Sequence, residues 1–218
     1  MIAVVDYQKG NLKSVERGLI AAGGEALITA DASEIAKADA IVLPGVGAFA
    51  DAAATMCELG QMEVIRERVR AGVPFLGICL GEHLMFEHGV EGAPEGNPAC
   101  GLGLLPGTVV AMPRCDAQGK AFKVPHVGWN TIETPACGEL AFACPLFDGI
   151  APGEYFYFTH SFIAPTGSHT IAETTHSVRF TSAVQFGERA FGVQFHPEKS
   201  SDSGARVLAN FVAIAARG

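Results

Sequence analysis

One cysteine of the sequence lies in a setting that suits nucleophilic chemistry. Cys79 follows an apolar run, residues 73–78, and lies two residues from Gly77 and from Gly81. This pattern predicts a buried strand, a sharp turn and a helix start, with the cysteine at the apex and no flanking Cβ atoms to crowd it. A helix start favours an anion, and therefore a thiolate. Cys79 is a candidate nucleophile, although a buried cysteine can equally be a core residue.

A candidate base and an acidic partner follow another apolar strand near the end of the chain. The run 190–195 predicts this strand, and His196-Pro197-Glu198 comes directly after it. Alternation places His196 and Glu198 on one side, where the carboxylate can orient the imidazole. A nucleophile, a base and an orienting acid are the parts that acyl transfer needs. The alternatives are a surface pair or a metal site, but no third ligand has suitable spacing, so no metal is expected.

A glycine-rich turn follows the predicted strand at 40–43. Its sequence, Gly45-Val46-Gly47-Ala48-Phe49-Ala50, formally matches a dinucleotide-binding pattern. It does not lie at the first turn between strand and helix, and the next strand ends in Cys79 where an acidic residue would bind the ribose. The same backbone could supply N–H groups to an oxyanion. The residues alone leave this interpretation and an ordinary tight turn open.

The elements that must position these residues alternate along the chain. Strands are expected at 2–5, 26–29, 40–43 and 73–78, and helices at 12–20, 33–37, 62–69 and 80–87. This alternation predicts an α/β fold with a mainly parallel sheet covered on both faces. After residue 89 the pattern changes to loops and strands at 108–111, 155–162, 170–174, 181–186 and 190–195, before a last helix at 203–216. No repeat or linker marks a second domain.

Composition restricts the possible partners and surroundings. The 218 residues carry a formal net charge of −8 and no run of Lys or Arg, which argues against nucleic acid and anionic membranes as partners. The chain starts with a strand, no signal peptide is evident and no apolar run is long enough to span a membrane. None of the cysteines forms a Cys-x-x-Cys pair: they are Cys57, Cys79, Cys100, Cys115, Cys137 and Cys144. We therefore expect a cytoplasmic protein with reduced thiols.

Several stretches together resemble a known family. Gly77-Ile78-Cys79-Leu80-Gly81 and Gln194-Phe195-His196-Pro197-Glu198 resemble the signature of class I glutamine amidotransferases. A narrower resemblance, to the glutaminase subunits of imidazole glycerol phosphate synthases, rests on Asp6-Tyr7 with Gly10-Asn11, Pro44-Gly45-Val46-Gly47-Ala48-Phe49, Val124-Pro125-His126-Val127-Gly128-Trp129-Asn130, Tyr157-Phe158-Thr159-His160-Ser161-Phe162 and His196-Pro197-Glu198-Lys199-Ser200. The resemblance implies a flavodoxin-like fold over a single domain, residues 1–218, with additional antiparallel strands in the C-terminal half.

The resemblance also implies an activity and assigns residues to it. Cys79 would attack the carboxamide of glutamine, His196 would exchange the protons, and Glu198 would hold His196. The other implied residues are Val46, Gly47 and Leu80 at the oxyanion hole; Gly45, His83, Ser161 and Phe162 at the bound glutamine; and Asn11, His126, Trp129, Tyr157 and Lys199 at the partner interface or ammonia gate. No cofactor is implied.

The implied partner is a cyclase subunit with a (β/α)8 barrel. Glutamine would be hydrolysed to glutamate and ammonia, and the ammonia would pass through a channel to the cyclase of the heterodimer. The cyclase would then form imidazole glycerol phosphate and an aminoimidazole carboxamide ribonucleotide in histidine biosynthesis.

The sequence departs from the family pattern at one implied substrate contact. His83 stands where the family has Gln, and Glu82 precedes it where Met is common. Because an imidazole presents one tip where an amide presents a donor and an acceptor, weaker glutamine binding or an altered pH dependence is expected. Two alternatives follow: a non-catalytic or weakened partner-binding subunit, and the glutaminase of another synthase. Labelling of Cys79 by a glutamine-like electrophile discriminates the first, and co-purification with a cyclase discriminates the second.

Overall fold

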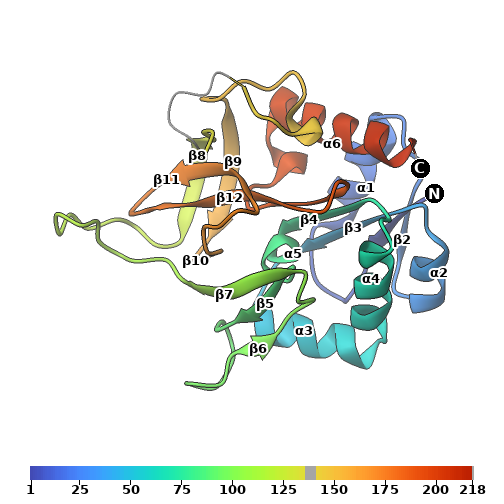
Figure 1. The fold of residues 1–218 in the computed structure, drawn as a ribbon, viewed down its shortest axis with the longest axis horizontal. Coiled ribbons are helices and arrows are strands. Elements are labelled where there is room, and N and C mark those ends of the chain that lie inside the picture. Colours follow the sequence, from blue (N-terminus) through green and yellow to red (C-terminus); the bar gives the residue numbers. More distant parts are fainter. Residues whose placement is uncertain (136–140, 218) are drawn as a thin grey trace.

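A seven-stranded sheet lies at the centre of the protein, in a computed structural model that describes residues 1–135 and 141–217 (Figure 1). Its strand order is β11-β12-β13-β4-β3-β1-β2. The strands are β1 (Ile2–Val5), β2 (Ala26–Thr29), β3 (Ala40–Gly45), β4 (Phe75–Cys79), β11 (Thr170–Thr175), β12 (Arg179–Phe186) and β13 (Ala190–Val193). From β2 to β13 all neighbours are parallel, whereas β12 runs antiparallel to both of its neighbours, β13 and β11. The predicted α/β class and mainly parallel sheet are thereby confirmed.

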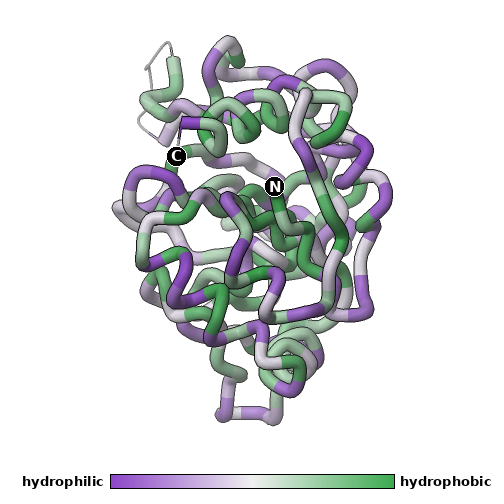
Figure 2. The backbone as a smooth tube through the Cα atoms, turned by 90° about the vertical axis from the view of Figure 1, so that its right-hand side faces the viewer, coloured by the Kyte–Doolittle hydropathy of each residue, from purple (hydrophilic) through white to green (hydrophobic). Residues whose placement is uncertain are grey.

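Helices cover both faces of this sheet and bury a hydrophobic cluster on each. The helices are α1 (Leu12–Ala21), α2 (Ala32–Lys37), α3 (Phe49–Glu58), α4 (Gln61–Arg70), α5 (Leu80–His83) and α6 (Ser201–Ala215). One cluster includes Leu19 of α1 and Phe211 of α6, and the other includes Met56 of α3 and Ile65 of α4. In Figure 2 the hydrophobic residues follow the inner segments and the hydrophilic ones the outer turns. Burial on both faces explains the continuous apolar runs of the parallel strands.

Two smaller sheets extend the fold beside the carboxyl ends of the parallel strands. One has the order β10-β7-β5-β6 and the other is the pair β8-β9. Their strands are β5 (Phe86–Gly89), β6 (Ala99–Cys100), β7 (Leu105–Ala111), β8 (His126–Thr131), β9 (Tyr155–His160) and β10 (Phe162–Ile163), and Pro145–Phe147 and Pro197–Lys199 form 3-10 turns. The expected strand at 155–162 is divided at Ser161 because β9 pairs with β8 and β10 with β7.

Some sequence expectations about elements are wrong. The helix expected at 80–87 ends at His83, and Phe86–Gly89 forms β5 instead. Leu84, Met85 and Phe86 are all buried, so this stretch has no polar face with which a helix could meet water. Ile20 of α1 is 54% exposed, although it is a large apolar residue. No helix was expected at Phe49–Glu58, where alanines give little periodic signal.

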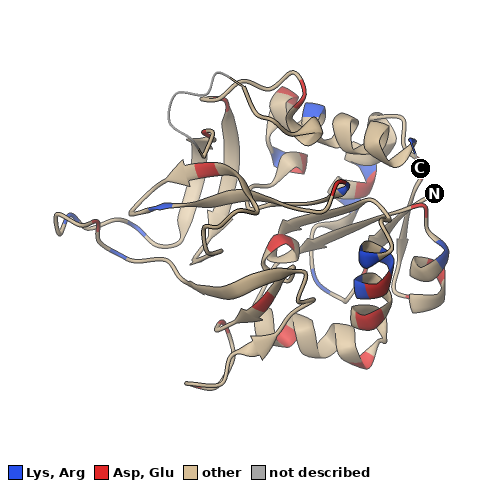
Figure 3. Ribbon diagram, in the orientation of Figure 1, with Lys and Arg blue, Asp and Glu red and all other residues tan. Residues whose placement is uncertain are grey.

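Charged side chains of both signs lie next to one another on the surface. Figure 3 shows Lys and Arg beside Asp and Glu on α4, whose sequence places Glu63, Arg66, Glu67 and Arg68 in turn. No helix in the described parts of the chain has the length and apolar character needed to cross a bilayer. Within the described residues, five cysteines carry free thiols; Cys137 lies outside them.

Candidate active site

Cys79 forms the predicted turn between β4 and α5. Its backbone angles are φ 54° and ψ −107°, a conformation that a residue with a side chain rarely adopts. The flanking glycines are needed for close approach, because a Cβ on Gly81 would lie 1.8 Å from the Leu43 carbonyl oxygen and one on Gly77 would lie 2.5 Å from the Gly81 carbonyl oxygen. The strained turn therefore holds the thiol at the carboxyl end of the central strand.

Parallel pairing brings the other candidate groups to the same edge of the sheet. Gly45, at the end of β3, pairs directly with Cys79, and Val193, at the end of β13, pairs with Ile78. His196 follows β13 within three residues. The glycine-rich turn therefore lies on one side of Cys79 and the histidine on the other, which is the arrangement expected where parallel strands end together.

His196 and Glu198 form a buried pair. Glu198 Oε1 accepts a hydrogen bond from His196 Nδ1 at 3.0 Å, and both side chains are almost completely buried. Burial lowers the pKa of His196, but hydrogen bonding and charge from Cys79 and from Glu198 outweigh it and raise this pKa to about 9. Among the described residues, His196 Nε2 has no hydrogen-bond partner of good geometry. The imidazolium is thus stabilised beside the sulfur, with its free nitrogen available to exchange a proton.

A cavity of about 220 Å³ opens beside Cys79. It is lined by Val46, Gly47, Cys79, Leu80, His83, Glu91, Pro125, Thr159, His160, Ser161 and Phe162. Seven of these were predicted from the sequence. Glu91, Pro125, Thr159 and His160 were not, although the last two directly precede the predicted Ser161 in the chain. The predicted oxyanion and glutamine residues are therefore gathered around one small space, with Gly45 next to Cys79.

His83 lines this cavity and is almost completely buried. Its Nε2 lies 2.7 Å from Gln194 Oε1. Burial lowers its pKa to about 4 despite this hydrogen bond, so the ring is neutral near pH 7. The adjacent Glu82 is completely buried, its pKa is well above the ordinary value because of desolvation, and its Oε2 lies 3.8 Å from His83 Nε2. Gln194 belongs to the signature noted in the sequence, but its contact with His83 was not predicted, because it depends on where β13 places this residue.

Tyr7 is a second group that sequence reasoning did not assign. Its side chain is completely buried, and a Cβ on Gly45 would lie 1.8 Å from its hydroxyl oxygen. Burial, followed by the charge of Cys79, raises the pKa of Tyr7 above its usual range. The neutral hydroxyl therefore lies under the glycine-rich turn, and only glycine fits at position 45.

The residues predicted for the partner interface divide into two groups. Trp129 of β8 is 51% exposed, its ring contacts that of Tyr157 edge to face at 6.2 Å, and Lys199 Nζ lies 5.8 Å from the Tyr157 ring centre. These three form one surface cluster. His126, in contrast, is only 5% exposed and stacks on Phe158 inside the protein, so its side chain is not a surface contact in the isolated chain. Asn11 precedes α1 and is half-buried.

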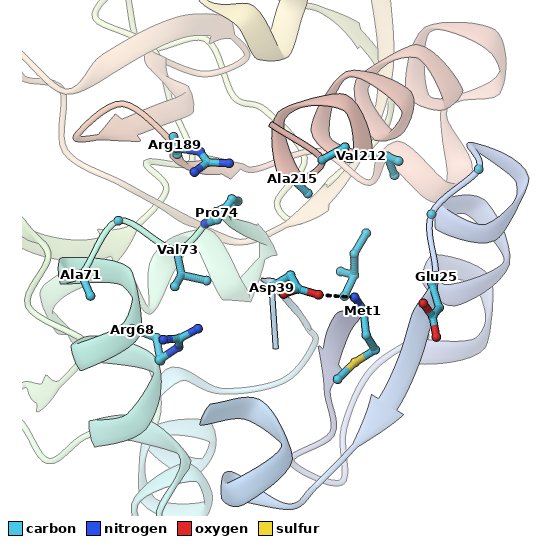
Figure 4. A pocket seen from close by; sticks show the side chains of 15 residues that line it. Met1, Glu25, Asp39, Arg68, Ala71, Val73, Pro74, Arg189, Val212 and Ala215 are labelled. Carbon is cyan, nitrogen blue, oxygen red and sulfur yellow. Dashed lines mark hydrogen bonds and ion pairs between the residues drawn. The ribbon is translucent and has the colours of Figure 1, made fainter. Parts of the chain in front are cut away.

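A larger cavity, of about 630 Å³, lies elsewhere, at the amino ends of the parallel strands (Figure 4). Arg68 and Arg189 line it, but each donates a hydrogen bond to a backbone carbonyl, of Ala38 and of Ile214 respectively. None of the predicted site residues lines it. Within residues 1–135 and 141–217, no three His, Cys, Asp or Glu side chains are grouped as metal ligands.

Comparison with known proteins adds independent evidence. The family described as "Glutamine amidotransferase class-I" matches residues 3–215. "Imidazole glycerol phosphate synthase subunit HisH" of Moorella thermoacetica is 44% identical, over 96% of this chain and 93% of that protein. The protein of the same name from Syntrophotalea carbinolica is 40% identical, over 97% and 98%.

Solved structures share the fold. A "Crystal structure of glutamine amidotransferase" gives a TM-score of 0.70 at 20% identity, with 99% of this chain and 98% of that chain covered. "Structure of PurLQS from Thermotoga maritima" gives 0.69 at 17% identity, with 97% of each chain covered. Because the family model matches residues 3–215 and the relatives are 40% and 44% identical, the chain belongs to the class I glutamine amidotransferase family and is an enzyme of the glutaminase type.

Proposed function

We propose that the protein hydrolyses glutamine to glutamate and ammonia through Cys79, His196 and Glu198, as the glutaminase subunit of an imidazole glycerol phosphate synthase. The observation that carries this proposal is the meeting of three features at one sheet edge: a strained cysteine, a buried histidine–carboxylate pair, and a cavity lined by Cys79, Leu80 and the Val46–Gly47 turn. The relatives named HisH support the pathway, histidine biosynthesis.

In the proposed first half-reaction, the Cys79 thiolate attacks the carboxamide carbon of glutamine. The negative charge moves to the carboxamide oxygen, which the backbone N–H groups of Val46 or Gly47 and of Leu80 would bind. The His196 imidazolium then donates its proton to the departing nitrogen, the C–N bond breaks and ammonia leaves a thioester on Cys79. Glu198 keeps the ring oriented and stabilises its charge, which agrees with a His196 pKa of about 9.

In the second half-reaction, water attacks the thioester. Neutral His196 now removes the proton of the water, the C–S bond breaks, and glutamate leaves with Cys79 restored as the thiolate beside a protonated His196. The glutamine side chain would enter between the Val46–Gly47 turn and the Ser161–Phe162 segment, with His83 also lining its site. The cavity volume of about 220 Å³ suits a substrate of amino-acid size.

We further propose that the surface cluster of Trp129, Tyr157 and Lys199, with Asn11, binds a cyclase subunit of (β/α)8 fold. A half-exposed tryptophan beside an aromatic ring and a cation is typical of the residues that dominate protein interfaces. Ammonia released at Cys79 would pass from the cavity into the cyclase. His126, the buried first residue of β8, would act through the β8–β9 pair and not by direct contact.

The test is Cys79→Ala in the complex reconstituted with the cyclase subunit. We expect glutamine-dependent synthesis to be lost, by a factor of about 10⁴ or more, while synthesis from added ammonium is retained. Comparable glutamine-dependent turnover in the variant would show that Cys79 is not the nucleophile. Loss of both activities would indicate a failure of assembly, which size-exclusion chromatography of the complex detects.

A further inference from the structure

The side chain of Gln194 connects His83 to Cys79 across the sheet. Gln194 directly follows β13, and its side chain is completely buried. Its Oε1 lies 2.7 Å from His83 Nε2, and its Nε2 lies 3.7 Å from Cys79 Sγ. Gln194 and Cys79 are 115 positions apart in the chain, so only the pairing of β13 with β4 brings them together.

The protonation of His83 determines which end of the amide meets the sulfur. A neutral imidazole carries one N–H, and burial keeps His83 neutral near pH 7. When that hydrogen is on Nε2, it is donated to Gln194 Oε1, and the amide NH2 group must point toward Cys79. The opposite orientation would place the amide oxygen against the sulfur, where it would repel a thiolate.

We propose that Gln194 is a positioning residue whose amide, oriented by His83, donates a hydrogen bond to the Cys79 thiolate. The protonated form of the sulfur has another contact, since Cys79 Sγ lies 3.9 Å from the Thr159 carbonyl oxygen, which can only accept. The amide donor therefore favours the charged sulfur, and the Thr159 carbonyl favours the neutral one. His83 thus acts on the nucleophile through Gln194, in addition to lining the glutamine cavity.

Other titratable groups face the same sulfur and must remain unchanged in a test. His196 lies beside it from the β13 end and Tyr7 from the loop after β1. Glu82, on α5, lies 3.8 Å from His83 Nε2, and protonation of His83 would lower the pKa of His160 on β9. Neither carboxylate oxygen of Glu82 has a hydrogen-bond partner in the described chain. A change at position 194 leaves all these groups in place, so a shift in thiolate formation can be attributed to the amide.

The experiment measures thiolate formation directly, because this proposal deepens the proposed glutaminase function but can be tested without glutamine. The rate of Cys79 alkylation by iodoacetamide is measured from pH 5 to 10 in the complex with the cyclase, by mass spectrometry of the peptide that contains Cys79. Gln194→Met keeps the size of the side chain but removes the hydrogen-bond donor. In this variant we expect the pH midpoint of the alkylation rate to rise by about one unit, so that alkylation below the midpoint becomes about tenfold slower.

Two further variants keep the proposal falsifiable if Gln194→Met fails to fold. His83→Leu removes the group that orients the amide, so the same upward shift is expected without any change at Gln194. His83→Gln retains a hydrogen-bond donor for Gln194 Oε1, so its alkylation midpoint is expected to equal that of the unchanged protein. Gln185→Met is the matched control, because Gln185 lies on β12 and donates to the Gly187 carbonyl, away from the sulfur. Its profile should equal that of the unchanged protein.

Steady-state kinetics with glutamine complete the test. For Gln194→Met we expect kcat to fall about tenfold while KM changes less than about twofold, since the amide contacts the nucleophile and not the substrate. An unchanged or lowered alkylation midpoint in both Gln194→Met and His83→Leu would overturn the proposal. The alkylation midpoint could also shift although neither the unchanged protein nor the variants turn over glutamine. In that case the proposed glutaminase function fails, but the positioning role of Gln194 stands.

Discussion

At the residue scale, the proposed reactive groups could be predicted from the sequence, but the contacts that support them could not. Cys79 is marked by its flanking glycines and His196 by the carboxylate two positions later, because the chemistry of each depends on near neighbours. Gln194 and Tyr7 depend on contacts between distant segments, at Cys79 and at Gly45. No local spacing reports such contacts, so they become visible only when the strands are paired.

Replacing Glu198 by glutamine tests the orienting carboxylate. An amide keeps the shape of the side chain but cannot stabilise the imidazolium, so the raised His196 pKa should fall toward its ordinary range. We expect Glu198→Gln to lower glutamine-dependent kcat by about 10²–10⁴ in the complex, with ammonium-dependent synthesis unchanged. A variant with full glutamine-dependent kcat would remove Glu198 from the mechanism.

His83→Gln tests the departure from the family at the glutamine cavity. An amide at this position supplies a donor and an acceptor, whereas the neutral imidazole uses its Nε2 toward Gln194. We expect the KM for glutamine to fall about fivefold, equivalent to about one added hydrogen bond, with kcat within about twofold. A KM that does not change would place position 83 out of contact with the substrate.

At the element scale, the strands and helices with strong periodic patterns were predictable and the segments with uniform burial were not. The strand at Ile2–Val5 is confirmed to the residue, and the last helix differs by one or two residues at its ends. The helix expected after Cys79 is short because Leu84–Phe86 must be buried, and an apolar stretch without period fits a strand as well as a helix. Tertiary pairing of β5 with β7 decided the outcome.

The pairing of β8 with β9 contains a hydrogen-bonded chain of neutral histidines. His160 Nδ1 donates to the Phe162 carbonyl at 2.8 Å, so its Nε2 accepts from His126 Nδ1 at 3.0 Å. Asn130 Nδ2 lies 3.3 Å from His126 Nε2. Burial is the main cause that lowers the pKa of His126 to about 4 and that of His160 to about 3. Protonation of either ring would leave two donors facing each other.

This histidine chain predicts how stability depends on pH. The pKa values of both histidines in the folded protein lie below the unfolded value of about 6.5. Their contribution to the free energy of unfolding is therefore fully present above pH 6.5 and is lost as the pH falls toward 4. We expect the free energy of unfolding, measured by urea titration, to fall by up to about 2 kcal/mol per histidine by pH 5. In the double variant His126→Gln with His160→Gln, the free energy of unfolding should fall less steeply with pH. The control His88→Gln, on β5, should show the same fall as the unchanged protein. Equal slopes in all three proteins would contradict this account.

At the scale of the whole molecule, the proposed partner surface and the proposed reaction occupy the same end of the sheet. Trp129, which the sequence marked as the only tryptophan, lies on the exposed face of β8. The fold class was predictable because strands and helices alternate over the first half of the chain. The small sheets β10-β7-β5-β6 and β8-β9 were not, because their pairing joins segments separated by loops rich in glycine and proline.

Trp129→Ala tests the surface cluster as an interface. Because the side chain is half exposed, we expect the free energy of unfolding to change by less than about 0.5 kcal/mol. Binding to the cyclase, measured by isothermal titration calorimetry, should weaken by about 2 kcal/mol, or about thirtyfold. Leu27→Ala is the control, since Leu27 is exposed on the distant edge strand β2. Equal affinities of the two variants would place the interface elsewhere.

The parallel pairing of β13 with β4 also makes the activity a reporter of folding. A chain in which these strands have not paired still contains a thiol at position 79, but His196 and Gln194 are not beside it. Helices α1 and α4 can form from local contacts, whereas this pairing joins residues far apart in the chain and must form slowly. During refolding with the cyclase present, we therefore expect the helical circular dichroism signal to recover before glutamine turnover. The interval between the two measures how long after helix formation β13 pairs with β4.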